Sequence, residues 1–152
     1  MQSRQIVAVL HNIRSRENVG SIFRTADAAG VSKIYLCGIT PRPPHDKISK
    51  TALGAETTVP WEYHKQTWRL IEQLKKDGYL IVALEKTKSA EDIFKFEPKF
   101  PMALIVGNEI DCLNSEILNR ADEIAAIPMY GRKESLNVAV SFGIAVYILL
   151  NR

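Results

Sequence analysis

A polar, turn-rich segment joins the last apolar strand expected in this sequence to its last apolar helix. It reads Ile127-Pro128-Met129-Tyr130-Gly131-Arg132-Lys133-Glu134-Ser135-Leu136-Asn137-Val138. Pro and Gly interrupt regular hydrogen bonding, and Ser and Asn stand where the helix begins. Backbone N–H and C=O groups outside regular elements are free to bind other molecules. The segment therefore predicts a binding loop for a small polar ligand.

Asn18, Gly20 and Arg24 form a second group of residues that could do chemistry. Gly20 and Arg24 are four positions apart, so on a helix they share one face. Gly20 allows another group to approach the backbone closely, and Arg24 offers a planar fork of donors that suits phosphate. Asn18 could cap the helix. A lone arginine on a polar helix face is usually just solvated, so a binding role for Arg24 depends on the other segments.

Two further loops follow apolar strands, at Glu85-Lys86-Thr87-Lys88 and at Gly107-Asn108-Glu109. In open α/β sheets, ligands bind beyond the carboxyl ends of the strands, so these loops and the one after Ile127 are expected to share a site. The sequence has neither a GxGxxG motif nor a P-loop, and the usual nucleotide sites therefore lose their main support. Its histidines are scattered and give no case for a hydrolase or a metal site.

These segments, in this order, resemble the motifs of the SpoU family of RNA ribose 2′-O-methyltransferases, part of the SPOUT superfamily. The matching stretches are Asn18-x-Gly20-x-x-x-Arg24, Leu104-Ile105-Val106-Gly107-Asn108-Glu109, and Ile127-Pro128-Met129 through Ser135-Leu136-Asn137-Val138. Thr51-Ala52-Leu53-Gly54-Ala55 also looks like a segment that the family carries between its first two motifs. Each motif alone is weak, but the ordered set is specific and covers the chain from about Val7 to Leu150.

The resemblance implies a parallel-sheet α/β fold whose C-terminal part forms a deep trefoil knot, with the last helix threaded through an earlier loop. It also implies that S-adenosylmethionine binds in a bent shape across the three loops. Adenine would lie in an apolar slot, although the apolar residues there could equally be ordinary core. The residues implied to bind the cofactor are Leu84, Gly107, Ile127, Met129 and Leu136.

The reaction implied is in-line transfer of the sulfonium methyl group to a ribose 2′-hydroxyl, without a metal. In the family, the arginine matching Arg24 binds the target phosphate and activates the hydroxyl. A guanidinium stays protonated at neutral pH, so we expect positioning and phosphate contact rather than proton abstraction. Glu109 could instead pair with Arg24 or cap the following helix. The other residues implied to hold the catalytic site are Asn18, Glu109, Ser135 and Asn137.

The charge distribution fits RNA as the substrate. Residues 1–50 carry eight Lys or Arg against three acids, a net charge of +5, and the remainder carries −2 of the total of +3. A basic third attracts phosphates, although a solvated basic surface is an equally good interpretation of charge alone. Arg14 and Arg16 are expected to contact the RNA backbone. We favour tRNA over rRNA, because a compact enzyme suits a small folded substrate.

Two other functions remain open at this point. One is a noncatalytic RNA-binding module of the same fold, which would have little reason to keep Arg24, Glu109, Ser135 and Asn137 together. The other is a SPOUT enzyme that methylates a base nitrogen. The Ser135-Leu136-Asn137 pattern resembles the ribose-modifying branch and ranks this alternative lower.

Alternating strands and helices must position these segments, as in an α/β fold. Strands are predicted at residues 4–10, 33–37, 57–61, 79–84, 102–106 and 123–127. Helices are predicted through residues 19–29, 47–53, 68–77, 113–119 and 138–150, with Gly30 and Gly78 each ending one. The continuous apolar strands at 79–84 and 102–106 are typical of a parallel sheet covered on both faces.

Length and composition indicate one soluble domain over residues 1–152, with no appended RNA-binding domain. Cys37 and Cys112 are expected to be buried free thiols, which suits a reducing cytoplasm. No leader or membrane-spanning segment is recognised. The last helix is apolar nearly all round, so it must be covered. We favour a homodimer interface, and a wholly internal core helix is the alternative.

Overall fold

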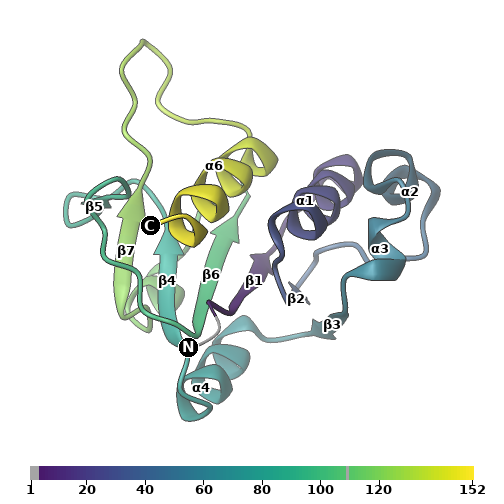
Figure 1. Ribbon diagram of the computed structural model, residues 1–152, viewed down its shortest axis with the longest axis horizontal. Coiled ribbons are helices and arrows are strands. Elements are labelled where there is room, and N and C mark those ends of the chain that lie inside the picture. The colour runs from purple at the N-terminus through teal and green to yellow at the C-terminus, as the bar shows by residue number, and fades with distance from the viewer. Residues whose placement is uncertain (1–3, 109) are drawn as a thin grey trace.

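Seven parallel strands form one sheet in the order β3-β2-β1-β6-β4-β7-β5 (Figure 1). The structure is a computed structural model and describes residues 4–108 and 110–152. The strands are β1 (Ile6–His11), β2 (Lys33–Cys37), β3 (Trp61–His64), β4 (Leu80–Leu84), β5 (Glu91–Asp92), β6 (Met102–Gly107) and β7 (Glu123–Ala126). The predicted parallel α/β sheet is therefore confirmed.

Six helices accompany the sheet in the described part of the chain. They are α1 (Arg16–Ala29), α2 (Asp46–Ala52), α3 (Ala55–Thr58), α4 (Thr67–Lys76), α5 (Ser115–Leu118) and α6 (Val138–Leu150). Ser15, rather than Asn18, caps α1, because its side chain accepts a hydrogen bond from the Asn18 N–H. Gly30 ends α1 with φ 82°, a conformation that favours glycine. Asn137 caps α6 by accepting from the N–H groups of Ala139 and Val140.

Two apolar layers sandwich the sheet. Residues of β1 alternate between them: Ile6, Ala8 and Leu10 belong to the layer under α1 and α6, and Val7 and Val9 to the layer under α4 and α5. This alternation explains why β1 and β6 are buried along almost their whole length. The sheet therefore has a covered core on both faces.

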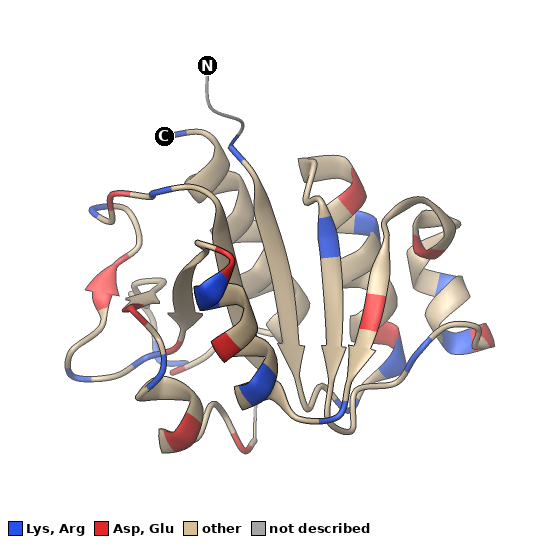
Figure 2. Cartoon of the chain, turned by 90° about the horizontal axis from the view of Figure 1, so that it is seen from below, with Lys and Arg blue, Asp and Glu red and all other residues tan. Residues whose placement is uncertain are grey.

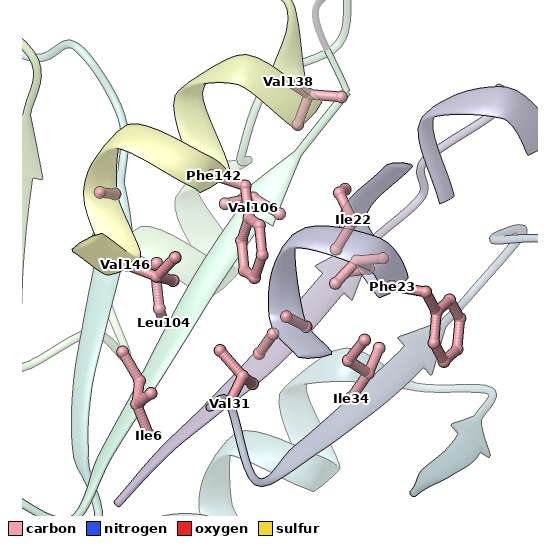
Figure 3. Close-up of a cluster of buried hydrophobic side chains, with 14 of the residues drawn as sticks. Ile6, Ile22, Phe23, Val31, Ile34, Leu104, Val106, Val138, Phe142 and Val146 are labelled. Atoms are coloured by element: carbon pink, nitrogen blue, oxygen red, sulfur yellow. The ribbon is translucent and has the colours of Figure 1, made fainter. Parts of the chain in front are cut away.

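The layer under α1 and α6 contains the largest fully buried side chains. Figure 3 shows Phe23 and Ile22 of α1, Phe142 and Val146 of α6, and Leu104 of β6 gathered in it. Charged residues lie mainly on helices and loops (Figure 2). Among the charged residues on strands, Lys33 of β2 and Glu62 of β3 pair with each other at 2.6 Å.

Gly20 brings α1 and α2 into close contact. A Cβ at this position would lie 2.0 Å from Thr51 Oγ1 and 2.3 Å from the Ile48 carbonyl oxygen. The Thr51 hydroxyl also donates to the Glu17 carbonyl at 2.8 Å. The close approach expected at Gly20 is therefore made by α2, within the fold.

The strand predicted at residues 57–61 is wrong. Its β-branched residues, Thr57 to Val59, suggested extended structure, but the backbone forms α3 over Ala55–Thr58 and the strand starts at Trp61. The Thr57 hydroxyl donates to the Gly54 carbonyl at 2.8 Å, which supports the turn. The two-residue strand β5 was not predicted, because it has no apolar pattern.

Cys112 differs from expectation, and α6 is not the wholly internal core helix of the alternative prediction. Cys112 is exposed, in a left-handed turn with φ 55°, whereas Cys37 is buried. The last helix is only partly internal: Phe142 and Val146 are fully buried, but Val140 is 50% exposed. The remaining apolar surface of α6 lies at the molecular surface of the single chain.

Candidate functional site

A pocket opens at the carboxyl ends of β4, β6 and β7. The loop from β7 to α6 projects beyond this edge of the sheet (Figure 1). The pocket holds about 670 Å³ of empty space when its open mouth is included. All five residues predicted for the cofactor line it, namely Leu84, Gly107, Ile127, Met129 and Leu136. Ser135 lines it as well.

Asn108 shapes the loop after β6. Its Oδ1 accepts hydrogen bonds from the N–H groups of Ile110 (2.9 Å) and Asp111 (2.6 Å). Its Nδ2 donates to the Asn12 carbonyl at 3.0 Å, which ties this loop to the end of β1. Asn108 is buried, so these bonds satisfy a side chain that would otherwise be costly to desolvate.

Gly107 is required by packing inside the protein. A Cβ there would lie 2.8 Å from Leu113 Cδ2 and 3.2 Å from the Cys112 backbone. The glycine therefore lets the chain at residues 112–113 fold back against the end of β6. It also leaves its backbone at the pocket wall.

Glu85, at the end of β4, connects two loops of the pocket. Its Oε2 accepts from the Leu113 N–H at 3.0 Å, and its Oε1 accepts from the Lys86 N–H at 3.3 Å. The sequence predicts a loop after this strand but assigns no role to Glu85. The only sequence signal for Glu85 is its position directly after an apolar strand. Besides Glu85, the pocket residues without a predicted role are Lys86, Val106, Asn108, Cys112, Ala126, Glu134, Val138 and Ser141.

Asn18 and Asn137 meet although they are 119 positions apart in sequence. The Asn137 Nδ2 donates to Asn18 Oδ1 at 3.2 Å, while Asn137 Oδ1 caps α6. The first predicted segment therefore lies beside the third. Glu109, the remaining residue predicted between them, lies outside the described residues.

The predicted RNA-contacting arginines lie next to the pocket or on α1. An adjoining hollow is lined by Arg14 and Asn18, and it shares Asn108 and Val138 with the pocket. Arg14 pairs with Asp111 at 2.9 Å, an exposed pair that contributes little stability. Arg16 and Arg24 are exposed on α1 and line neither hollow. Within residues 4–108 and 110–152, Arg24 has no hydrogen bond or ion pair.

The chemistry of the pocket is polar rather than nucleophilic. Partial burial, then Glu85 and Asp111, raise the pKa of the Cys112 thiol, so it is protonated at neutral pH and is a poor nucleophile. Among the described residues, no three His, Cys, Asp or Glu side chains come together as metal ligands.

The described helices are also too short or too polar to cross a bilayer.

Fold and pocket define a class of protein: a parallel α/β sheet with a pocket formed by three loops at the carboxyl ends of its strands, where such sheets bind their ligands. The sequence profile of the SpoU rRNA Methylase family matches residues 5–147. The chain belongs to this family.

Named relatives act on both tRNA and rRNA. The chain is 29% identical over 152 residues to the tRNA (guanosine(18)-2′-O)-methyltransferase of Borreliella burgdorferi, covering 100% of this chain and 69% of the relative. It is 32% identical over 145 residues to the 23S rRNA (guanosine(2553)-2′-O)-methyltransferase of Bacillus subtilis, covering 94% and 57%.

A solved structure extends the similarity to three dimensions. The AdoMet-bound rRNA methyltransferase from Sinorhizobium meliloti has a TM-score of 0.92 and 30% identity, over 99% of this chain and 57% of that one. The chain thus spans between 57% and 69% of the length of these three proteins.

Proposed function

We propose that this protein transfers a methyl group from S-adenosylmethionine to a ribose 2′-hydroxyl of RNA. The observation that carries the proposal is the pocket at the carboxyl ends of β4, β6 and β7, lined by the third motif and by the end of β6. Membership of the SpoU family and the activities of the named relatives support the same reaction.

The residues of the pocket suit this cofactor. Leu84, Ile127 and Leu136 offer an apolar slot for adenine, and backbone groups of the loop after Ile127 offer donors and acceptors for its edge. Gly107 and Met129 complete the wall on either side. When bound, S-adenosylmethionine supplies an electrophilic methyl group.

Residues of this chain would then position the RNA. Arg24 is exposed and unpaired within the described part of the chain, so its guanidinium is available for a phosphate. The Asn18 to Asn137 hydrogen bond ties α1 to the start of α6. Arg14 and Arg16 extend the basic surface beside the pocket. Glu109 is assigned to the same site by the motif alone.

We also propose the finer structural features that the family implies. These are a deep trefoil knot around α6, one methyltransferase domain over residues 1–152, and a homodimer. The exposed Val140 and Tyr147 on α6, at 50% and 47%, support a dimer because they leave an apolar surface open. The unpaired thiols of Cys37 and Cys112 fit a reducing cytoplasm.

The proposal is tested by measuring methyl transfer from labelled S-adenosylmethionine to unmodified tRNA and to unmodified rRNA, as separate pools. We expect a 2′-O-methylated nucleoside from one pool, and we favour tRNA. Absence of transfer to either pool, with S-adenosylhomocysteine binding retained, would point to a missing partner or to an untested RNA. Loss of that binding as well would favour the noncatalytic RNA-binding module. A methylated base would favour the SPOUT base methyltransferase.

A further inference from the structure

Glu85 is a carboxylate in the pocket wall that no cation neutralises. It lies directly after β4 and is partly buried, and among the described residues it has no ion pair. Its Oε2 is fixed by the Leu113 N–H at 3.0 Å. Its Oε1 has only the contact at 3.3 Å with the Lys86 N–H. A carboxylate has about four lone-pair directions, so Glu85 can accept further hydrogen bonds from the pocket.

The position of Glu85 indicates which hydrogen-bond donors of the cofactor its carboxylate can reach. Leu84, the preceding residue, belongs to the apolar slot proposed for adenine. The ribose is bonded directly to adenine, whereas the sulfonium and the ammonium groups are several bonds farther away. A ribose carries two adjacent hydroxyl groups, and a carboxylate at the end of a parallel strand is well suited to accept from such a pair.

We propose that Glu85 accepts hydrogen bonds from the ribose hydroxyls of the bound cofactor. This inference rests on the proposed function, because it takes the pocket as the site of S-adenosylmethionine. The Leu113 N–H holds the Glu85 carboxylate in place before the ligand arrives, so less conformational entropy is lost on binding. Glu85 is then both a link between two loops and a residue that selects ribosides over deoxyribosides.

Calorimetry with 5′-methylthioadenosine and its 2′,3′-dideoxy counterpart tests the ribose contact. Both ligands lack the ammonium and sulfonium groups, so they report only on adenine and the sugar. The wild-type protein should bind the riboside at least about tenfold more tightly, as expected for hydrogen bonds to a charged acceptor. In Glu85→Gln, affinity for the riboside should fall by about tenfold and the preference should largely disappear. The glutamine carbonyl can still accept from the Leu113 N–H, so the loops are expected to stay in place.

Glu97→Gln is the control, since Glu97 is an exposed glutamate that does not line the pocket and the substitution removes the same charge. It should keep the preference for the riboside. The inference is overturned if Glu85→Gln binds the riboside as the wild type does. It is also overturned if Glu85→Gln loses both ligands equally, which would indicate a structural role only, or if it weakens S-adenosylmethionine but not 5′-methylthioadenosine. Wild-type protein that binds neither S-adenosylhomocysteine nor 5′-methylthioadenosine would overturn the proposed cofactor itself.

Discussion

Arg24 is the residue to which the proposed reaction assigns the most chemistry. It is exposed on α1 and lines neither hollow, so it does not shape the pocket for the cofactor. We therefore expect Arg24→Ala to lower methyl transfer by at least about a hundredfold, a loss typical of a positioning and charge-stabilising group. Calorimetry should give the same affinity for S-adenosylhomocysteine as the wild type.

Arg69→Ala provides the control for Arg24→Ala. Arg69 is an exposed arginine of α4, on the opposite side of the sheet, next to the ring of Trp68. This variant should transfer methyl groups at close to the wild-type rate. Retained turnover in Arg24→Ala would contradict the assignment of Arg24.

We expect His11 to make the stability of the protein depend on pH. Its Nδ1 lies 2.7 Å from Thr67 Oγ1, and its Nε2 lies 3.3 Å from Asn12 Nδ2. Asn12 Oδ1 accepts from the Ile39 N–H at 3.0 Å, so its NH2 group faces His11 and Nε2 must be the acceptor. The neutral imidazole therefore fits the site. Burial lowers the pKa of His11, and Glu116 opposes this in part.

The direction of the pH effect follows from this lowered pKa. Near pH 6.5 the unfolded chain takes up a proton that the folded chain resists. The stabilising contribution of neutral His11 is thus complete above pH 6.5 and is lost as the pH falls towards the folded-state pKa. In urea unfolding, the wild type should lose more stability than His11→Gln between about pH 7.5 and about pH 5.5. Equal losses in both proteins would show that His11 does not titrate in this way.

Single residues show which features of the site could be predicted from the sequence and which could not. Gly107 was predicted at the pocket, and it is there, but the packing of Leu113 against it could not be foreseen. Glu85 was not assigned, because its contact with Leu113 joins two loops that are 28 positions apart. The roles of Asn18 and Asn137 came only from the family resemblance, since periodicity says nothing about contacts between distant segments.

At the scale of elements, Gly20 makes the packing of α1 on α2 possible. A methyl group there would clash with the Ile48 carbonyl and the Thr51 hydroxyl. Gly20→Ala should therefore lower the free energy of unfolding by about 2 kcal/mol, although alanine favours the helix. Gly131→Ala is the control, because nothing lies within 4 Å of its added Cβ, and the change should be within about 0.5 kcal/mol. Urea unfolding that shows equal stability for both variants would contradict this packing account.

Elements with local signals were predicted well. The bounds of β2 and α6 agree with the prediction, because β2 is a compact apolar run and Asn137 marks the start of α6. Between Ala55 and His64 the strand was predicted too early in the chain. The β-branched residues there favour a strand, but Gly54 and Pro60 fix the turns, and the strand forms only after them. The helix α1 starts before Asn18, because two residues able to cap stand three positions apart and Ser15 takes the cap.

For the whole molecule, we predict a homodimer that covers α6. Size-exclusion chromatography with light scattering should give twice the mass of 17.1 kDa. Val140→Asp places a charge on the exposed face of α6 and should give a folded monomer. Leu53→Asp is the control and should leave the dimer intact, because Leu53 is 64% exposed at the end of α2, and α2 lies on the other side of α1 from α6 (Figure 1). A wild-type protein of 17.1 kDa would contradict the dimer.

The order of strands in the sheet and any knot in the chain lie beyond sequence periodicity. Apolar runs predicted parallel strands, but nothing in them specifies that β1 lies between β2 and β6. That arrangement, and the meeting of three loops at one edge, decides where the pocket forms. Only the ordered motifs pointed to it in advance.

The position of the transferred methyl group tests the central claim most directly. After transfer from labelled S-adenosylmethionine to unmodified RNA, the RNA is hydrolysed with alkali, which requires a free 2′-hydroxyl at each phosphodiester that it cleaves. We predict that the label appears in an alkali-resistant dinucleotide and that Arg24→Ala gives almost none. Label in a mononucleotide would place the methyl group on a base and would contradict ribose 2′-O-methylation.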